Sequence, residues 1–365
     1  MHIFRRIGSV RENERRQDMK VGELYEIPLG IRVRSTDELR PEKGEFTVSV
    51  KASGVCTSDV KMAKRGHPML DIYGLPFIGG HEFSGVVHEL GEGVEWIRPG
   101  QRVVVSWINP CLECHYCKMG LFQFCLNAKD TLIQPAGFSE MVKIPWYHQR
   151  TRVYPFSEGT SFEAAACTEP VACALNGIQN AGVEASDTVA VLGAGFMGLL
   201  LVQLARLRGA ARVVVVDAVE ERLERATSLG ATDVINFEKE DSVQKVLELT
   251  GGFGADVVIE ATGTIHAYRQ AVLMGRKDST VLYFGGLPTD LTLDIDPNII
   301  HYRQVTLKGS YSYTTETFRN ALRLIESGRI EVEDLITHRY PLDRLKDAVV
   351  KAGEKDSLKV MITYS

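Results

Sequence analysis

Residues 188–198 read TVAVLGAGFMG, a short apolar run that ends in three closely spaced glycines. The run is rich in valine and does not alternate with polar residues, which is typical of a strand buried on both faces, and the segment FMGLLLVQLARL that follows has the pattern of a helix. In this context the first glycine allows a tight turn, the second lets the backbone approach a pyrophosphate, and the third lets helix and strand pack closely. The amino end of the helix then faces the phosphates. The stretch predicts a dinucleotide site that contains Gly193, Gly195, Phe196, Met197 and Gly198.

An acidic residue follows at the distance that such a site requires. Asp217, 24 residues beyond Gly193, ends the next apolar run, RVVVVD. A carboxylate there would accept hydrogen bonds from both hydroxyls of the adenosine ribose and repel a 2′-phosphate, so the sequence favours NAD over NADP. Arg222 comes about one helical turn later, where it would either stack on the adenine or lie on a solvated helix face.

Apolar runs alternate with amphipathic ones from Asp187 to Phe284, which is the pattern of a parallel sheet covered by helices on both faces. On either side the chain has short strands punctuated by glycine and proline, such as EFTVSVKASG, which predict a mostly antiparallel, partly barrel-like domain. The expected fold class is α/β, with a doubly wound domain inserted into a β-rich one. The expected divisions are an N-terminal extension at 1–18, the β-rich domain at 19–170, the dinucleotide domain at 171–312 and a return to the β-rich domain at 313–365.

Four of the seven cysteines fall within fifteen residues, with the spacing C-x2-C-x2-C-x7-C. This spacing can place four thiolates around one tetrahedral ion, and a site with four sulfur ligands leaves no position for water. We therefore expect a closed structural zinc site in a lobe at about 109–126. The expected ligands are Cys111, Cys114, Cys117 and Cys125.

A second set of candidate metal ligands is spread along the chain, in GVCTSDV, GGHEFSG and CTEP. One thiolate, one imidazole and one or two carboxylates form a mixed set that leaves room for a water or a substrate oxygen, as a catalytic zinc site does. Asp59 would accept the imidazole proton of His81, and Ser58 would pass a proton to or from an alcohol. Each residue taken singly also fits a structural role, as a core cysteine, a turn histidine or a helix-capping glutamate. The candidate residues of this set are Cys56, His81, Glu82 and Glu169.

The composition limits the partners that the protein can have. Its 365 residues include 42 basic and 47 acidic side chains, a formal charge of −5, so no global positive field exists to attract nucleic acid or an anionic membrane. A small-molecule partner is expected instead. No stretch has the ~20 apolar residues of a membrane span, and the first residues do not read as a signal peptide, so we expect a cytoplasmic protein with reduced cysteines.

Together these motifs make the chain resemble the zinc-containing medium-chain dehydrogenase/reductase family from about Met19 to the C-terminus. The matching stretches are GVCTSDV, GGHEFSGVV, PGQRVVV, the four-cysteine lobe, EPVACALNG and VLGAGFMG. The resemblance implies a GroES-like catalytic domain and a Rossmann domain, with an alcohol bound in the cleft between them. It also implies a homodimer or homotetramer. We expect two zinc ions per subunit. At the position of Glu169 some members of the family have a cysteine, and the glutamate makes this chain more similar to the sorbitol, polyol and threonine dehydrogenase branches. Backbone beside the nicotinamide is expected at Gly285 and Gly286, although a plain strand-end turn fits these two glycines as well, and Gly263 is a further candidate for cofactor binding.

One position departs from the family pattern. Many members have a histidine five residues after the first zinc cysteine, where it completes a proton relay, whereas this chain has Lys61. Either the relay ends in solvent after Ser58 and the cofactor ribose, or Lys61 replaces the histidine, or Lys61 binds substrate. Trp107, Tyr311 and Tyr313 are candidates for the wall of the pocket, although packing in the core or on the surface fits each of them as well.

The sequence predicts NAD-dependent oxidation of a secondary hydroxyl on a polyol, cyclitol or sugar derivative, with zinc as Lewis acid and Ser58 as the first proton acceptor. Two alternatives within enzymes are a threonine-type dehydrogenase, which Lys61 disfavours, and a simple primary or secondary alcohol dehydrogenase. An alternative of another class is an NAD-binding structural or regulatory protein without catalytic chemistry. The joint presence of the candidate zinc ligands argues against it, because fold stability alone does not require an open zinc site.

Overall fold

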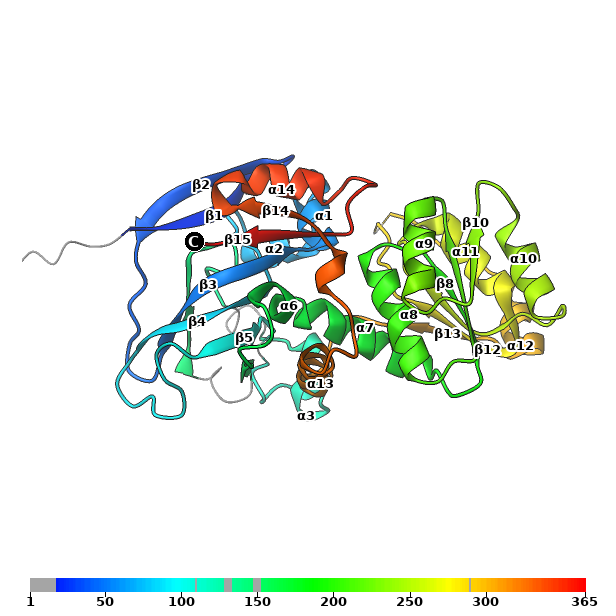
Figure 1. Ribbon diagram of the computed structural model, residues 1–365, viewed down its shortest axis with the longest axis horizontal. Helices are drawn as coiled ribbons and strands as arrows, with labels where there is room; N and C mark the ends of the chain where they lie inside the picture. Colours follow the sequence, from blue (N-terminus) through cyan, green and yellow to red (C-terminus); the bar gives the residue numbers. More distant parts are fainter. Residues whose placement is uncertain (1–17, 109, 128–132, 147–151, 289) are drawn as a thin grey trace, which may run out of the picture.

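The computed structural model describes residues 18–108, 110–127, 133–146, 152–288 and 290–365. The extension predicted at residues 1–18 lies outside this part of the chain apart from Asp18, which begins the first strand. Two lobes lie side by side (Figure 1), one built from both ends of the chain and the other, in green and yellow, from its middle. The fold is therefore of the expected α/β class, with one domain inserted into another.

The first lobe is built on a mostly antiparallel sheet that joins distant parts of the chain. Its strand order is β14-β15-β3-β4-β5-β7, and β6 also pairs with β3. Valine and phenylalanine side chains from the central strands, such as Phe46, Val48 and Phe83, fill the core of this lobe. A separate hairpin, β1 with β2, lies beside this sheet. The strands are β1 (Asp18–Glu26), β2 (Gly30–Asp37), β3 (Phe46–Val55), β4 (Glu82–Leu90), β5 (Arg102–Ser106), β6 (Met141–Ile144), β7 (Val153–Pro155), β14 (Ile336–Pro341) and β15 (Lys359–Thr363).

The second lobe contains a parallel sheet with the order β10-β9-β8-β11-β12-β13. This is the Rossmann strand order, in which the direction of winding reverses between the first strand and the fourth. Ligands of such sheets bind outside the carboxyl ends of the strands at that reversal, which here lies between β8 and β11. The strands are β8 (Thr188–Leu192), β9 (Arg212–Asp217), β10 (Asp233–Asn236), β11 (Ala255–Glu260), β12 (Gly275–Tyr283) and β13 (Thr306–Gly309).

Alternate residues of the central strand β8 point to opposite faces of this sheet, and helices cover both faces. Val189 and Val191 pack with α8 and α9, whereas Ala190 and Leu192 pack with α10 and α11. Burial on both faces explains why the strands are valine-rich and do not alternate with polar residues. The helices are α8 (Phe196–Leu207), α9 (Glu220–Ser228), α10 (Ser242–Leu249), α11 (Ile265–Met274) and α12 (Pro297–Arg303).

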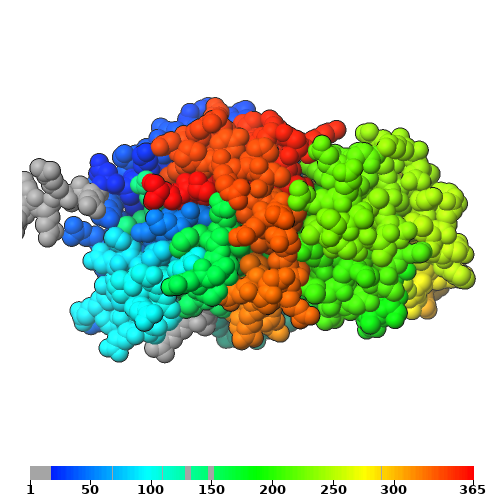
Figure 2. Space-filling view, viewed as in Figure 1, coloured from blue at the N-terminus to red at the C-terminus, as the bar shows by residue number. Residues whose placement is uncertain are grey.

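Three helices connect the lobes: α6 (Phe162–Ala166), α7 (Thr168–Ala181) and α13 (Thr315–Glu326). Figure 2 shows the orange segment that contains α13 filling the junction. α7 packs on α13 and also on α8 of the second lobe. The division expected between residues 170 and 171 falls inside α7, because this helix is continuous and buried against both lobes.

The other helices are short. The longest helix among the described residues, α7, has 14 residues. None of the described helices combines the length and the apolar character needed to cross a membrane. The remaining helices, of α or 3-10 type, are α1 (Thr57–Arg65), α2 (Pro68–Tyr73), α3 (His115–Lys118), η1 (Phe122–Phe124), η3 (Glu333–Leu335), η4 (Leu342–Arg344) and α14 (Leu345–Lys351).

Candidate functional site

Cys56, His81 and Glu82 meet beside the paired strands β3 and β4. Cys56 follows β3 and caps the amino end of α1, while His81 and Glu82 lead into β4. In the antiparallel register Gly54 lies opposite Glu82, and a Cβ at Gly54 would be only 1.9 Å from Glu82 Oε2. One potential ligand atom from each of the three side chains lies within 4.8 Å of the other two. The fold therefore brings a thiol, an imidazole and a carboxyl group from two separate sequence motifs into one cluster.

Glu169 approaches this cluster from a third element. It lies in the first turn of α7 and is 9% exposed. Burial raises its pKa to about 7, and the charges of His81 and Glu82 act on it as well, in opposite directions. The thiol of Cys173, one helical turn later, donates a hydrogen bond of 3.5 Å to Glu169 Oε1. Glu169 is thus close enough to interact electrostatically with His81 and Glu82, but it is not one of the three side chains whose ligand atoms lie within 4.8 Å of one another.

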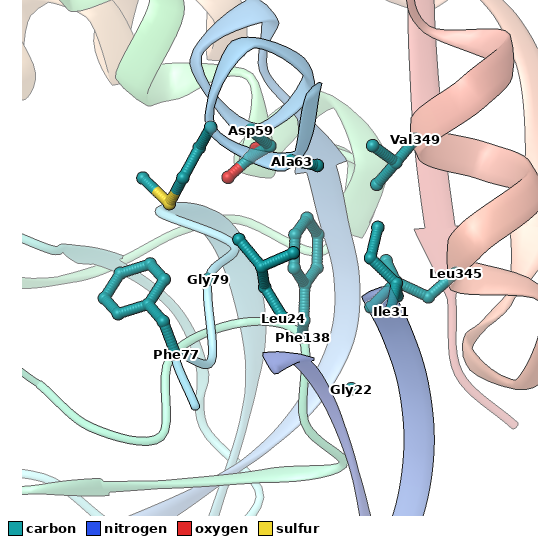
Figure 3. Close-up of a pocket in the computed structure, with 11 residues that line it drawn as sticks. Gly22, Leu24, Ile31, Asp59, Ala63, Phe77, Gly79, Phe138, Leu345 and Val349 are labelled. Carbon is teal, nitrogen blue, oxygen red and sulfur yellow. The ribbon is translucent and has the colours of Figure 1, made fainter. Parts of the chain in front are cut away.

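Asp59 holds the backbone of Cys56 rather than the ring of His81. Its Oδ2 accepts a hydrogen bond of 2.9 Å from the Cys56 N–H, whereas its Oδ1 lies 3.9 Å from His81 Nδ1, which is beyond hydrogen-bond distance. The carboxyl group borders a small apolar cavity of about 30 Å³ (Figure 3), lined among others by Leu24 and Phe138. Burial in these surroundings raises the pKa of Asp59. The expected hydrogen bond from His81 is therefore not formed, although Asp59 Oδ1, the oxygen that does not bind Cys56, lies within ion-pair distance of the ring.

A buried lysine, which the sequence analysis missed, faces the cluster from the last strand. Lys359 forms an ion pair with Glu82, and the two side chains are 3% and 1% exposed. Burial lowers the pKa of Lys359, but the charges of Glu82, Cys167 and Cys56, together with the hydrogen bond to Glu82, outweigh that effect, and the net shift is upward. The ammonium nitrogen also lies 4.9 Å from the ring centroid of Phe196 in the second lobe. The only available signal was a single charge in the apolar run LKVMITY.

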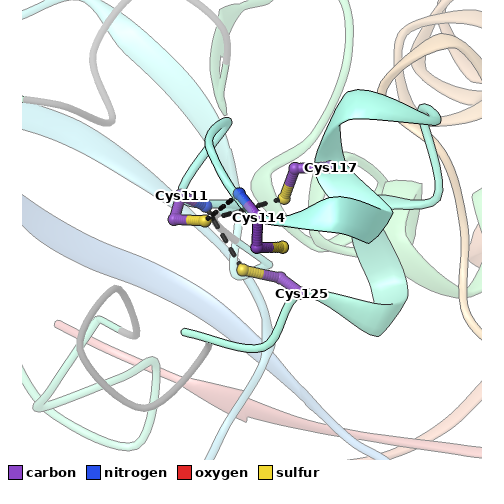
Figure 4. Close-up of side chains that lie close together, drawn as sticks. All are labelled: Cys111, Cys114, Cys117 and Cys125. Atoms are coloured by element: carbon purple, nitrogen blue, oxygen red, sulfur yellow. Dashed lines mark hydrogen bonds between the residues drawn. The ribbon is translucent and has the colours of Figure 1, made fainter.

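The four cysteines of residues 111–125 converge on one point (Figure 4), and their Sγ atoms lie within 4.8 Å of one another. Backbone N–H groups point at the sulfurs: that of Cys114 donates to Cys111 Sγ and that of Cys111 donates to Cys125 Sγ, both at 3.3 Å. The N–H groups of Leu126 and Cys117 lower the pKa of Cys114 to about 6. The local backbone therefore favours a thiolate at Cys114, the form that binds a metal, whereas burial raises the pKa of Cys117 to about 12 and raises that of Cys125 as well.

The donor chemistry of both clusters fits Zn²⁺. Four thiols that converge on one point match a closed tetrahedral zinc site. One thiol, one imidazole and one carboxyl group, with Glu169 beside them, match an open zinc site, which keeps a position for water or substrate. Cys167 and Cys173, the cysteines outside both clusters, surround the Glu169 segment as expected, with Cys167 fully buried.

A cavity of about 720 Å³, which we call the interlobe cavity, lies at the carboxyl ends of β8 and β9. Leu192 pairs with Val216, so the glycine turn and Asp217 lie side by side. Gly193 has a φ of +102°, and a Cβ at Gly198 would be 1.8 Å from the Gly193 carbonyl oxygen, so each position requires glycine. The cavity is lined by the predicted dinucleotide residues and, at its other end, by the metal cluster, including Gly195, Phe196, Met197, Gly198, Cys56, Glu82 and Lys359.

Asp217 and Arg222 also line the interlobe cavity, and both bind backbone. The two carboxylate oxygens of Asp217 accept hydrogen bonds of 2.7–2.9 Å from the N–H groups of Ala194, Ala218 and Val219, so this side chain braces the glycine turn. Arg222 donates to the carbonyl oxygens of Lys355 and Ser357 at 2.6 and 3.1 Å. These bonds tie the second lobe to the C-terminal segment of the first. Arg222 thus lines the cavity while it remains half-exposed, and stacking on an adenine there stays a prediction.

A second cavity, of about 500 Å³, opens beside α1, and we call it the α1 cavity. Ser58 and Lys61 line it from the first lobe, and Gly285 and Gly286 line it from the second. The further glycine candidate for cofactor binding, Gly263, packs directly behind this pair, since a Cβ there would be 2.8 Å from the Gly286 carbonyl oxygen.

The aromatic residues proposed for the pocket wall separate into three environments. Tyr311 lines the α1 cavity. Tyr313 is 2% exposed in the core, where its hydroxyl group lies 3.1 Å from Ser106 Oγ, so packing and not the pocket explains it. Trp107 packs against the ring of His81, with 5.6 Å between the centroids. A stacked pair that no sequence pattern indicated, Tyr268 and Tyr283, also lines the α1 cavity, and the two ring centroids are 4.1 Å apart.

Known proteins share this architecture. A family model for the alcohol dehydrogenase GroES-like domain matches residues 42–155, and one for zinc-binding dehydrogenases matches residues 197–327. Sorbitol dehydrogenase of Bombyx mori is 29% identical over 87% of this chain and 91% of its own length, and L-threonine 3-dehydrogenase of Bacillus licheniformis is 32% identical over 84% and 87%. The solved structure of a zinc-binding dehydrogenase of Sinorhizobium meliloti 1021 bound to NADP superimposes with a TM-score of 0.88 at 29% identity, covering 95% of this chain and 100% of that one.

Proposed function

This chain belongs to the zinc-containing medium-chain dehydrogenases, oxidoreductases that act on CH–OH groups, and on that premise we propose that it oxidises a secondary hydroxyl of a polyol, cyclitol or sugar derivative with NAD. One observation carries the proposal: the interlobe cavity contacts both the glycine turn and the cluster of Cys56 and Glu82. A reacting carbon placed there lies between a metal and a dinucleotide. The alternative of a non-catalytic NAD-binding protein gives no reason for this juxtaposition.

Each group of the site has a distinct task in this proposal. When bound, zinc held by Cys56, His81 and Glu82 or Glu169 supplies a Lewis acid, and the dinucleotide supplies the hydride acceptor. Ser58, two residues after Cys56, faces the α1 cavity and takes the hydroxyl proton.

Polar groups in the α1 cavity favour a polyhydroxy substrate over a simple alcohol. Ser58, Gln123, Asn180 and Ser310 offer hydroxyl and amide groups there. A dehydrogenase of simple apolar alcohols gains nothing from such groups, because a polar atom left without a partner on substrate binding costs free energy. The threonine-type alternative remains the second candidate because a threonine dehydrogenase is among the similar proteins.

The experiment that tests the proposed function is a turnover panel. NADH formation is followed with polyols, inositols, sugars, amino-acid alcohols and simple alcohols, each also with NADP. We expect a polyol or sugar derivative to give the highest kcat/KM. Equal or better turnover of L-threonine or of a simple primary alcohol contradicts the substrate class, and no turnover of any alcohol by the zinc-loaded protein contradicts the enzyme assignment.

Zinc content tests the two metal clusters separately. We propose two zinc ions per subunit of a homodimer or homotetramer, and we expect Cys114→Ser to retain one of them, because a serine hydroxyl is a poor replacement for a thiolate ligand. Elemental analysis of the purified protein measures the count. Cys167→Ala, at a buried cysteine outside both clusters, is the matched control and should retain two. Two ions in Cys114→Ser, or one in the unmodified protein, contradict the assignment.

Cofactor choice is expected to depend on Asp217. Asp217→Asn keeps one acceptor oxygen for the backbone N–H groups, replaces the other with an amide NH2 group and removes the negative charge. We therefore expect kcat/KM with NAD to fall by roughly 10-fold, the cost of a weakened charge-assisted hydrogen bond, while kcat/KM with NADP rises. Initial rates with both dinucleotides measure the ratio. An unchanged ratio would show that Asp217 only braces the turn.

A further inference from the structure

Basic side chains gather at one edge of the α1 cavity. Ser58, Lys61 and Arg65 are three and four residues apart on α1, so they share one helix face, and His67 follows as the residue that caps α2. Ser58, Lys61 and His67 line the cavity. Arg65 is close enough that its charge lowers the pKa values of Lys61 and His67, after the larger effect of burial in each case.

The cavity adjoins the metal cluster. Cys56 caps the amino end of α1 and lines the interlobe cavity, and Ser58, in the first turn of the same helix, lines the α1 cavity. Lys61 and Tyr311 both line the cavity. A molecule that fills it therefore extends from the reacting centre toward the basic edge.

No aspartate or glutamate is among the described residues that line the α1 cavity. Lys61 is half-buried, and its ammonium group donates one hydrogen bond of 3.0 Å to the Gly286 carbonyl oxygen. An ammonium group has three N–H donors, and in the part of the chain that the structure describes no carboxylate lies within 4.0 Å of this one. The charge of Glu260 raises the pKa of Lys61 slightly, as the smallest of the causes. The Glu260 side chain is itself fully buried and accepts hydrogen bonds from the N–H groups of Thr262 and Gly263.

We infer that the substrate carries an anionic group, a phosphate monoester or a carboxylate, which Lys61 binds in the α1 cavity. This inference rests on the proposed function and narrows its substrate class. Lys61 is a half-buried cation, and two of its N–H groups have no carboxylate partner in the described part of the chain. An anionic group on the substrate would bind these N–H groups more strongly than a neutral acceptor, because a charge-assisted hydrogen bond is about twice as strong as a neutral one. The hydroxyl and amide groups around it suit the rest of a polyhydroxy chain, and the stacked rings of Tyr268 and Tyr283 form an apolar part of the wall.

Binding measurements on the protein loaded with zinc and NADH test this inference without turnover. Three probes share a six-carbon chain: D-sorbitol is neutral, D-sorbitol 6-phosphate carries a phosphate and D-gluconate carries a carboxylate. By calorimetric titration we expect one charged probe to bind roughly 10- to 100-fold more tightly than D-sorbitol, the range of a hydrogen bond to a charged group. The charged probe that binds more tightly shows whether the anionic group of the substrate is a phosphate or a carboxylate.

Variants of α1 assign the preference to Lys61. Lys61→Met should abolish the difference between the charged probe and D-sorbitol, and Lys61→Arg should retain most of it. Lys64→Met removes a charge from the same helix but not from the cavity, and it should bind all three probes as the unmodified protein does.

Two results would overturn the inference: D-sorbitol binding as tightly as both charged probes, or Lys61→Met weakening all three probes alike. In the second case Lys61 acts on the site as a whole, as a proton carrier or a structural contact. An inactive protein that binds one anion selectively would contradict the proposed function alone, whereas an active enzyme without anion preference would contradict this inference alone.

Discussion

Cys56→Ser should lower kcat by more than ~100-fold while leaving the dissociation constant for NADH within about threefold of the unmodified value. Substitutions of residues that only support a metal ligand already cost about 10- to 100-fold, and in the proposed function Cys56 supplies a ligand atom itself. The proposed dinucleotide site is formed instead by the glycine turn and Asp217, which the substitution leaves unchanged. Turnover, zinc content and NADH fluorescence titration are measured on the same preparation.

The control for this experiment is Cys167→Ala, which removes a buried thiol that lies outside both metal clusters. It should retain two zinc ions and most of the turnover. If Cys56→Ser loses NADH binding together with turnover, Cys56 serves the structure of the cleft rather than the metal. If it retains turnover, the catalytic assignment of the cluster is wrong.

Lys359→Met should destabilise the metal-free protein by about 3–5 kcal/mol, because it leaves Glu82 as an unpaired carboxylate in the interior. Glu82→Gln combined with Lys359→Met removes both charges and should recover part of the loss, since the two side chains are in contact. Urea unfolding of the first lobe, followed by tryptophan fluorescence, measures the difference between variants. All three tryptophans of the chain lie in this lobe.

Lys346→Met is the matched control, because Lys346 is exposed on α14 and its substitution should change stability by no more than ~0.5 kcal/mol. A small effect of Lys359→Met would mean that Glu82 is readily protonated or hydrated when its partner is absent. A double variant less stable than Lys359→Met would show that the buried charge is not the source of the loss.

The parts of the site that could be predicted are those encoded by local spacing. The glycine turn and the four-cysteine cluster are each contained in about fifteen residues, so their geometry follows from the chain itself, and the turn has the positive φ at Gly193 that it requires. Cys56 and His81 could be paired from the sequence only through a family resemblance. Their proximity is set by the register of β3 on β4, which no local pattern specifies.

The remaining parts depend on contacts between distant segments. Lys359 reaches Glu82 because β15 pairs with β3 across about 300 residues, and Arg222 binds carbonyl oxygens more than 130 residues away. Asp59 was expected to bind His81 because that pairing is common beside metal sites, but its position at the start of α1 gives it a nearer donor in the Cys56 N–H. Tyr313 is buried because α13 packs on α7, which the sequence did not indicate.

The position of β15 in the first sheet also determines the order in which the protein can assemble during synthesis. β15 follows all six strands of the second sheet along the chain, yet it lies inside the first sheet between β14 and β3. The six strands of the second sheet run from residue 188 to residue 309 and leave the ribosome before it. The inserted domain can therefore fold while translation continues, whereas the edge of β3 stays open until β15 emerges. The first lobe, and with it the pairing of Lys359 with Glu82, is completed later than the domain inserted into it.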